Sequence, residues 1–572
     1  MYKTFKEVIK ISEIKTRILL CVIALMFLIG ILDALSVASI YPIINSIISD
    51  DLPDKLKFIN ELFPKTDLLV LTLSIFSALF FLKSIINYLF LSFYFNVLYN
   101  SQKNLTNRVF KSFICSDYEF EMHSKVSEKL RNVHFGSQLM KALHIVMSIF
   151  FEFLNLFSFL LLTILFFNFQ IFLIILIFLL IIYFIFYFLR KKIKTWGKNY
   201  TKTLLNLNKS MIDTFSSYKE IKVYKNEAFF FENFLKLNSF FTKISRSKSI
   251  ADSLPGIIIE LFLVILICLI LLYSVKILNM NLDTLFPFIA MFSVLVLKTM
   301  KSSITITNFL NQFSFVKSQV DILNEVNERY KKMNLDDVDL KTLRKTDFEK
   351  FNKIEFKDVA FSYISNDKTL DLKNLNLKIF KNEFIGISGK SGSGKTTILN
   401  LVIGFLKPNK GQILYNDKIL NNLFDKFRIS YLSQSTFLLD ASIKSNICVG
   451  INENEIDYSK LKKVIKDSEL ESFVSDKKEG LEFIVGENGR YLSEGQKQRL
   501  GLARALYYGP DILILDEPTS SLDVLTEGEI INSINKLKGK KTIILISHEF
   551  RNLDKCDKII KLENGVINVI NN

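Results

Sequence analysis

One short glycine-rich run carries the clearest chemistry in the sequence, and it reads Gly389-Lys390-Ser391-Gly392-Ser393-Gly394-Lys395-Thr396-Thr397. It follows the apolar residues 384–388, which are typical of a buried strand, and it opens a helical pattern near Thr396. Glycines let backbone N–H groups close around phosphate oxygens, and a helix N-terminus favours an anion. Lys395 adds a positive charge and Thr396 a hydroxyl for Mg²⁺. The run therefore predicts a loop that binds nucleotide phosphates.

A second candidate site is the apolar run 512–515, which ends in Asp516 and Glu517. A buried strand of this kind delivers two carboxylates at its end. Asp516 is expected to hold the Mg²⁺ shell, and Glu517 to polarise the attacking water. Downstream of a phosphate loop, this pair predicts hydrolysis of the bound nucleotide.

The elements that must position these residues begin near Asn352. From there strand-like runs such as 354–356 and 384–388 alternate with helical patterns. This alternation is typical of α/β domains. We therefore expect an α/β nucleotide-binding domain over residues 352–572.

Residues 352–572 resemble the nucleotide-binding domain of the ATP-binding cassette family, and the whole chain resembles its exporters. The run Leu492-Ser493-Glu494-Gly495-Gln496 is similar to that family's LSGGQ signature. Further landmarks occur in the family's order, namely the aromatic Tyr363, the Q-loop Gln434, the short exporter motif 486–489, the D-loop 520–523 and the switch histidine His548.

The resemblance implies ATP and Mg²⁺ as cofactors and assigns roles residue by residue. Glu517 and His548 would be catalytic, and Thr396, Gln434 and Asp516 would hold Mg²⁺. The implied ATP-binding residues are Tyr363, Gly389, Ser391, Gly392, Gly394, Lys395, Thr396, Thr397, Gln434, Ser493, Gly495, Gln496 and Asp523. One position departs from the family, because Glu494 stands where glycine is usual. We expect activity nonetheless, although a carboxylate that pointed inward would weaken ATP binding.

Composition places the rest of the chain in a membrane. Of 572 residues 49% are hydrophobic and 13% aromatic, and the net charge is +16. This excess of positive charge fits either a nucleic-acid-binding surface or the basic cytoplasmic loops of a membrane protein. The mean hydropathy of +0.28 favours the membrane protein. Five cysteines without paired spacing argue against a disulfide framework or a zinc site. We expect no nucleic-acid partner.

Long uncharged stretches predict six membrane-spanning helices, since one span needs about 20 residues. They lie near residues 18–48, 68–102, 144–168, 170–190, 255–275 and 283–316. We expect a helical transmembrane domain over 1–317 and a linker over 318–351. Lysines and arginines after residue 189 place the following loop in the cytoplasm. The chain is thus expected to be a multi-pass protein of the bacterial plasma membrane with its nucleotide-binding domain in the cytoplasm.

In the family, each ATP lies between the phosphate loop of one domain and the signature of another. This chain has one of each, so the resemblance implies a homodimer. A heterodimer with a related chain is the alternative. Segments 117–120 and 216–224 sit where the exporters place their coupling helices. ATP binding would then drive alternating access.

The first span at 30–42 and the loop 219–222 look most similar to bacterial flippases of lipid-linked oligosaccharides. Lys298 and Lys301 lie on nearly one helical face, where two ammonium groups could receive an anionic headgroup. The alternative is that this helix has already left the bilayer there. In spans one and two, Asp33 and Lys83 are expected to pair with each other.

These features predict an ATP-driven flippase of a lipid or a lipid-linked oligosaccharide. An exporter of peptides or small amphipathic toxins is the first alternative. A membrane ATPase with a gating or signalling role is the second. Neighbouring glycosyltransferase genes would favour the flippase, and a small precursor-peptide gene would favour the exporter.

Overall fold

A computed structural model describes residues 2–48, 67–123, 126–166, 169–276, 282–332, 348–363, 372–419, 427–520 and 522–571. The chain divides into two compact units. The first comprises Met1–Cys115 and Ser124–Asp337, and the second Ser116–His123 and Val338–Asn572. The short segment at 116–123 thus belongs to the same unit as the C-terminal domain, although the sequence inserts it between two long helices.

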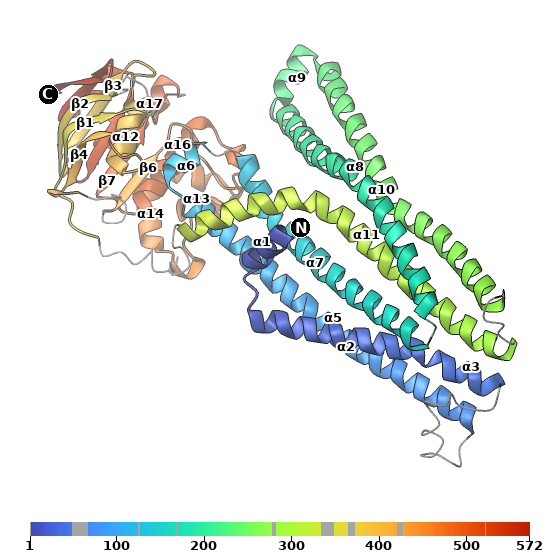
Figure 1. Ribbon diagram of the computed structural model, residues 1–572. Helices are drawn as coiled ribbons and strands as arrows, with labels where there is room; N and C mark the ends of the chain where they lie inside the picture. Colours follow the sequence, from blue (N-terminus) through green and yellow to red (C-terminus); the bar gives the residue numbers. More distant parts are fainter. Residues whose placement is uncertain are drawn as a thin grey trace. The chain divides into compact units, whose positions relative to one another are not determined.

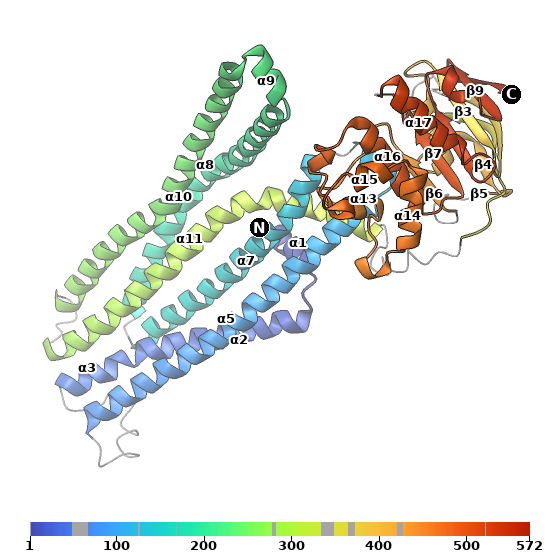
Figure 2. The same ribbon diagram turned by 180° about the vertical axis from the view of Figure 1, so that it is seen from behind.

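The first unit is helical throughout its described residues (Figures 1 and 2). Its helices are α1 (Tyr2–Ser12), α2 (Thr16–Ala38), α3 (Ile40–Ile48), α5 (Leu68–Ile114), α7 (Val126–Phe166), α8 (Phe169–Ser216), α9 (Tyr218–Tyr224), α10 (Glu227–Lys276) and α11 (Leu282–Lys332). α11 has 51 residues. At about 1.5 Å per residue it is about 75 Å long, more than twice the hydrocarbon core of a bilayer. The long helices therefore continue well beyond a membrane.

Five helical segments among the described residues are long and apolar enough to span a membrane. They are Thr16–Ile48, Leu68–Ile114, Leu139–Leu165, Glu227–Lys276 and Ile289–Phe313. The expected span at 170–190 falls in α8, most of whose side chains there are outside the described ones. The count of six spans therefore stays a prediction.

Helices α2, α5, α7 and α11 pack together as a bundle, while α8 and α10 run alongside each other with α9 at their tip (Figures 1 and 2). α11 continues to Lys332, into the segment expected to be a linker. The reason is an apolar stripe at helical spacing, formed by Val320, Leu323, Val326 and Tyr330, all of them buried. Residues 333–347 of that segment lie outside the described residues.

The second unit contains two sheets. The antiparallel one has the strand order β2-β1-β4-β5, with β1 (Lys353–Phe361), β2 (Leu372–Phe380), β4 (Lys410–Tyr415) and β5 (Lys418–Ile419). The larger one has the order β10-β9-β3-β8-β7-β6, with β3 (Phe384–Gly389), β6 (Ile429–Leu432), β7 (Ile512–Asp516), β8 (Thr542–Ile546), β9 (Lys558–Glu563) and β10 (Val566–Asn571). In the larger sheet only the edge strand β10 pairs antiparallel.

The helices of this unit are α6 (Tyr118–His123), α12 (Lys395–Ile403), α13 (Ile443–Ile447), α14 (Tyr458–Asp467), α15 (Glu471–Ser475), α16 (Glu494–Tyr507) and α17 (Val524–Asn535). Short 3₁₀ turns occur at Glu453–Glu455, Gly480–Glu482, Glu487–Gly489 and Phe550–Leu553.

Strand β7 shows why the sheet forms. Alternate residues of β7 enter two different cores: Ile512 and Ile514 pack with α12, while Leu513 and Leu515 pack with α16 and α17. A strand buried on both faces must be apolar along its whole length, as this one is. The expected fold class, a helical transmembrane region fused to an α/β nucleotide-binding domain, is confirmed.

Candidate functional site

The phosphate loop joins the end of β3 to the start of α12. Gly394 precedes the helix with φ 103°, and Gly392 has φ 75°, both in the left-handed region that favours glycine. A Cβ on Gly392 would meet nothing within 4 Å, so the loop is open at this point. The Lys395 ammonium is buried and donates to the carbonyl oxygens of Gly389 (2.9 Å) and Lys390 (3.2 Å). The lysine ammonium is therefore held inside the loop by two of the loop's own carbonyl groups.

Asp516 closes β7 and is 8% exposed. Tyr431, at the end of the adjacent strand β6, donates a hydrogen bond from its Oη to Asp516 Oδ2 at 3.0 Å. Burial raises the pKa of Asp516 above its ordinary value, and the hydrogen bond from Tyr431 opposes this rise. The aspartate is thus held in a fixed position by a neutral hydroxyl.

Glu517 follows with φ 50°, an uncommon conformation for a residue with a side chain. Its carboxylate lies 2.7 Å from His548 Nε2 and accepts from Gln434 Nε2 at 3.2 Å. Lys395 Nζ lies 3.8 Å from the same carboxylate. The structure therefore brings together the four residues Lys395, Gln434, Glu517 and His548 from four separate sequence motifs. A carboxylate so placed can orient and polarise a water for attack on a phosphate.

The residues expected to hold Mg²⁺ fit that ion. They offer a hydroxyl (Thr396), an amide oxygen (Gln434) and a buried carboxylate (Asp516), which are the hard oxygen donors that Mg²⁺ prefers. When bound, the ion would neutralise charge on the transferred phosphate.

The signature forms the start of α16. Ser493 Oγ accepts from the Gln496 backbone N–H (3.3 Å), and Gln496 Oε1 accepts from the Ser493 N–H (3.0 Å), which is a capping box. A Cβ on Gly495 would lie 2.6 Å from the Thr526 methyl carbon, so glycine is required there by close packing. Glu494 pairs with Lys497, one turn along the helix, at 2.7 Å. Its carboxylate is therefore engaged on its own helix.

The remaining predicted residues occupy neighbouring turns. Tyr363 Oη lies 3.2 Å from Thr397 Oγ1 in the first turn of α12, so an exposed aromatic ring stands beside the phosphate loop. Asp523 caps α17 by accepting from the Thr526 N–H at 3.1 Å. Ser391 is exposed on the loop, and Ser521 of the D-loop lies outside the described residues.

Sequence reasoning missed two aromatic residues at this site. The first is Tyr431, which stands three positions before Gln434 and donates to Asp516. Its closeness to the Q-loop in the sequence is the feature that could have indicated a role at the site. The second is Tyr118 on α6, within the predicted coupling segment. Its ring stacks on Phe405, at the end of α12, with centroids 4.5 Å apart and planes 14° apart. Helix α6 thus contacts the end of α12, the helix that follows the phosphate loop.

In the membrane unit, Asp33 pairs with Lys83, as expected, and also with Lys298 at 3.1 Å. Lys298 is thus engaged by a carboxylate, whereas Lys301 is exposed on the same helix. The two lysines do not share one environment.

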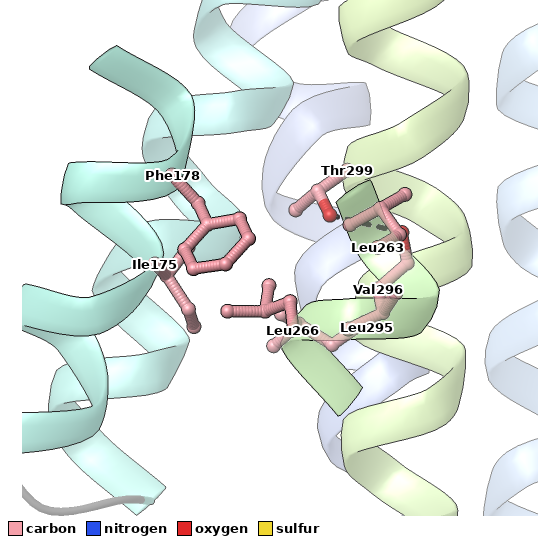
Figure 3. A pocket seen from close by; sticks show the side chains of 7 residues that line it. All are labelled: Ile175, Phe178, Leu263, Leu266, Leu295, Val296 and Thr299. Carbon is pink, nitrogen blue, oxygen red and sulfur yellow. Dashed lines mark hydrogen bonds between the residues drawn. The ribbon is translucent and has the colours of Figure 1, made fainter. Parts of the chain in front are cut away.

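A small cavity of about 20 Å³ lies between α8, α10 and α11 and is lined by Ile175, Phe178, Leu263, Leu266, Leu295, Val296 and Thr299 (Figure 3). Its single hydroxyl, on Thr299, already donates to the Val296 carbonyl oxygen at 2.9 Å. The volume is close to the minimum that one water requires. This cavity is a packing gap.

Comparison with known proteins agrees with the geometry. The family model "ABC transporter transmembrane region" matches residues 18–299, and the model "ABC transporter" matches residues 372–520. A putative export ATP-binding/permease protein of Rickettsia conorii is 38% identical over 215 residues, which is 37% of this chain and 37% of that protein. The leukotoxin translocation ATP-binding protein LktB of a Pasteurella haemolytica-like strain is 37% identical over 252 residues, or 43% of this chain and 33% of that one.

The matches to these relatives cover about a third of their length. The structure of a bacterial Atm1-family ABC exporter with ATP bound resembles the fold of the whole chain, with a TM-score of 0.73, 18% identity, and coverage of 96% and 94% of the two chains. The chain belongs to the ABC transporter family, with a transmembrane region and an ATP-binding domain in one polypeptide.

Proposed function

We propose that this ABC transporter is a homodimeric exporter of the bacterial plasma membrane, driven by ATP hydrolysis in its cytoplasmic domains. The arrangement of Glu517 with Lys395, Gln434 and His548 carries the proposal. A carboxylate next to a phosphate loop can activate a water molecule for hydrolysis. The same chain supplies long apolar helices, and hydrolysis would drive their conformational change.

The homodimer is supported by the surface at the tip of α8, α9 and α10. Phe215, Tyr218, Val223 and Tyr224 are each at least 60% exposed within the single chain. A cluster of exposed large apolar side chains is typical of a protein–protein contact. In the proposed dimer this tip would be covered by the partner subunit.

The direct test measures ATP hydrolysis by the purified chain in lipid nanodiscs, with Glu517→Gln beside the wild type. We expect wild-type hydrolysis, and we expect the variant to lose about 10²-fold or more, the usual contribution of a general base. The variant should still bind a fluorescent ATP analogue. Equal activity of both proteins would refute the role of Glu517, and a monomer in the presence of ATP would refute the homodimer.

For the substrate we propose a lipid or lipid-linked oligosaccharide, moved by alternating access, with Lys298 and Lys301 contacting an anionic headgroup. Support comes from the lysine-rich face of α11 within an apolar span. The pairing of Lys298 with Asp33 makes Lys298 the half-buried and oriented member of the two. Stimulation of ATP hydrolysis by an extracted glycolipid fraction, lost in the Lys298→Ala/Lys301→Ala double variant, is the expected result.

A second candidate, export of a peptide or small toxin, is favoured by the match to the leukotoxin translocation protein. Stimulation of hydrolysis by a peptide, together with indifference to every lipid fraction, would select this candidate over the first.

A further inference from the structure

The interior of the α2–α5–α7–α11 bundle contains polar side chains at membrane depth that the ATP site does not use. Asp33, Lys83, Glu152, Asn155, Lys298 and Ser302 all lie within candidate spans. We call these six residues the bundle cluster. Charged groups inside a membrane domain are costly and are usually retained for a purpose.

One half of the bundle cluster carries a net positive charge. Asp33 is the shared partner of Lys83 and Lys298, so one carboxylate faces two ammonium groups. Lys298 is the more accessible of the two lysines, since its side chain is 35% exposed against 15% for Lys83. This half can therefore accept an additional anion at Lys298.

The other half is negative and lacks a cation. Glu152 Oε2 accepts from Ser302 Oγ at 2.6 Å and from Asn155 Nδ2 at 3.4 Å, and both donors are neutral. Among the described residues, no lysine, arginine or histidine forms a salt bridge with Glu152. In addition, Asn155 is 5% exposed and its Oδ1 is buried without a hydrogen-bond partner. A buried acceptor without a partner, beside a carboxylate that no described cation pairs with, would be satisfied by an N–H donor with a positive charge.

The two halves adjoin each other. Lys298 and Ser302 are four residues apart on α11 and so share one helical face, about 5–6 Å apart. On α2, Gly30 stands one turn before Asp33, and a Cβ on Gly30 would lie 3.4 Å from Asn155 Oδ1. Glycine at this position thus leaves room for the amide group, whose Oδ1 is buried without a hydrogen-bond partner. The positive and the negative half of the bundle cluster therefore lie one helical turn apart.

We propose that the bundle cluster binds a zwitterionic headgroup that carries a primary ammonium and a phosphate or carboxylate. The ammonium donates to Glu152 and to Asn155 Oδ1, and the anion binds Lys298 in exchange for Asp33. This inference rests on the proposed transport function and narrows its substrate class. The same chemistry occurs in phosphatidylethanolamine and in the ends of a short peptide.

The test measures ATP hydrolysis by the full chain in phosphatidylglycerol nanodiscs that contain phosphatidylethanolamine or phosphatidylcholine. Phosphatidylethanolamine should stimulate hydrolysis severalfold, whereas phosphatidylcholine should not, because its methylated nitrogen has no N–H to donate to Asn155. Glu152→Gln and Asn155→Ala should abolish the difference between the two lipids. Glu260→Gln, which alters an exposed carboxylate on α10, is the matched control and should retain it.

A short peptide that stimulates instead of the lipid, with the same dependence on Glu152, would identify the peptide as the source of the headgroup. Equal responses of wild type and Glu152→Gln to both lipids and to the peptide would overturn the inference. Mass spectrometry of co-purified lipid provides a readout that does not need hydrolysis, and Glu152→Gln should retain less phosphatidylethanolamine. If the wild type hydrolyses no more ATP than Glu517→Gln, the proposed function itself fails.

Discussion

Replacing Tyr431 by phenylalanine tests whether a hydrogen bond to Asp516 sets the strength of Mg²⁺ binding. The substitution removes one hydroxyl and leaves the ring in place. The lost bond, 3.0 Å from Oη to Oδ2, goes to a carboxylate that is only 8% exposed. A hydrogen bond to a charged group contributes about 1.5–3 kcal/mol. Loss of such a partner of a metal ligand typically weakens metal binding about 10–100-fold, which corresponds to about 1.4–2.7 kcal/mol.

We therefore expect the Mg²⁺ concentration for half-maximal ATP hydrolysis to rise about 10–100-fold in Tyr431→Phe. Binding of an ATP analogue without Mg²⁺ should not change, and saturating Mg²⁺ should restore most of kcat. The assay is a Mg²⁺ titration of hydrolysis in nanodiscs, supported by electron paramagnetic resonance of bound Mn²⁺. Tyr458→Phe, which removes the hydroxyl of an exposed tyrosine on α14, is the control.

An unchanged Mg²⁺ requirement would refute the positioning role of Tyr431. A fall in kcat at saturating Mg²⁺ with an unchanged half-saturation point would refute it as well, since packing alone would then explain the loss.

Three further outcomes follow from single contacts. Gly411→Ala places a Cβ 2.3 Å from a backbone carbonyl oxygen at φ 74°, so the free energy of unfolding should fall by about 1–3 kcal/mol, measured by thermal unfolding. The control Gly528→Ala, whose Cβ meets nothing within 4 Å, should not destabilise the protein. Glu494→Ala should change ATP hydrolysis by no more than about twofold, because an exposed ion pair on its own helix is worth little; a larger change would show that the carboxylate reaches the nucleotide. Tyr118→Ala removes a stacked contact with Phe405, worth about 0.5–1.5 kcal/mol, and should reduce substrate-stimulated hydrolysis more than basal hydrolysis.

The parts of the site that could be predicted are those that are contiguous in sequence. The phosphate loop is a single run between a strand and a helix, and Asp516 and Glu517 are adjacent at the end of β7. In such cases local backbone geometry alone brings the functional groups together. The assembly of Glu517 with His548 was expected only through the family resemblance, because spacing along the chain does not place two strand ends side by side.

The contacts that could not be predicted depend on long-range packing. Tyr431 meets Asp516 because β6 and β7 are neighbours in the sheet, a pairing that no local pattern encodes. The sharing of Asp33 between Lys83 and Lys298 depends on the rotation of three helices about their axes. Hydropathy shows that these residues lie in spans but is silent about which way they face.

Helix α6 is a covalent link between the membrane helices and the nucleotide-binding unit. Its residues belong to the nucleotide-binding unit, yet the chain connects them to α5 before and α7 after. Tyr118 stacks on Phe405 at the end of α12, and α12 begins at Lys395 of the phosphate loop. The pKa of Tyr431 is raised, first by burial and then by Asp516. A displacement of α6 would therefore reach the phosphate loop through α12. Because α6 is covalently joined to α5 and α7, a movement of those helices would be passed through the stack of Tyr118 on Phe405 to the helix that follows the phosphate loop.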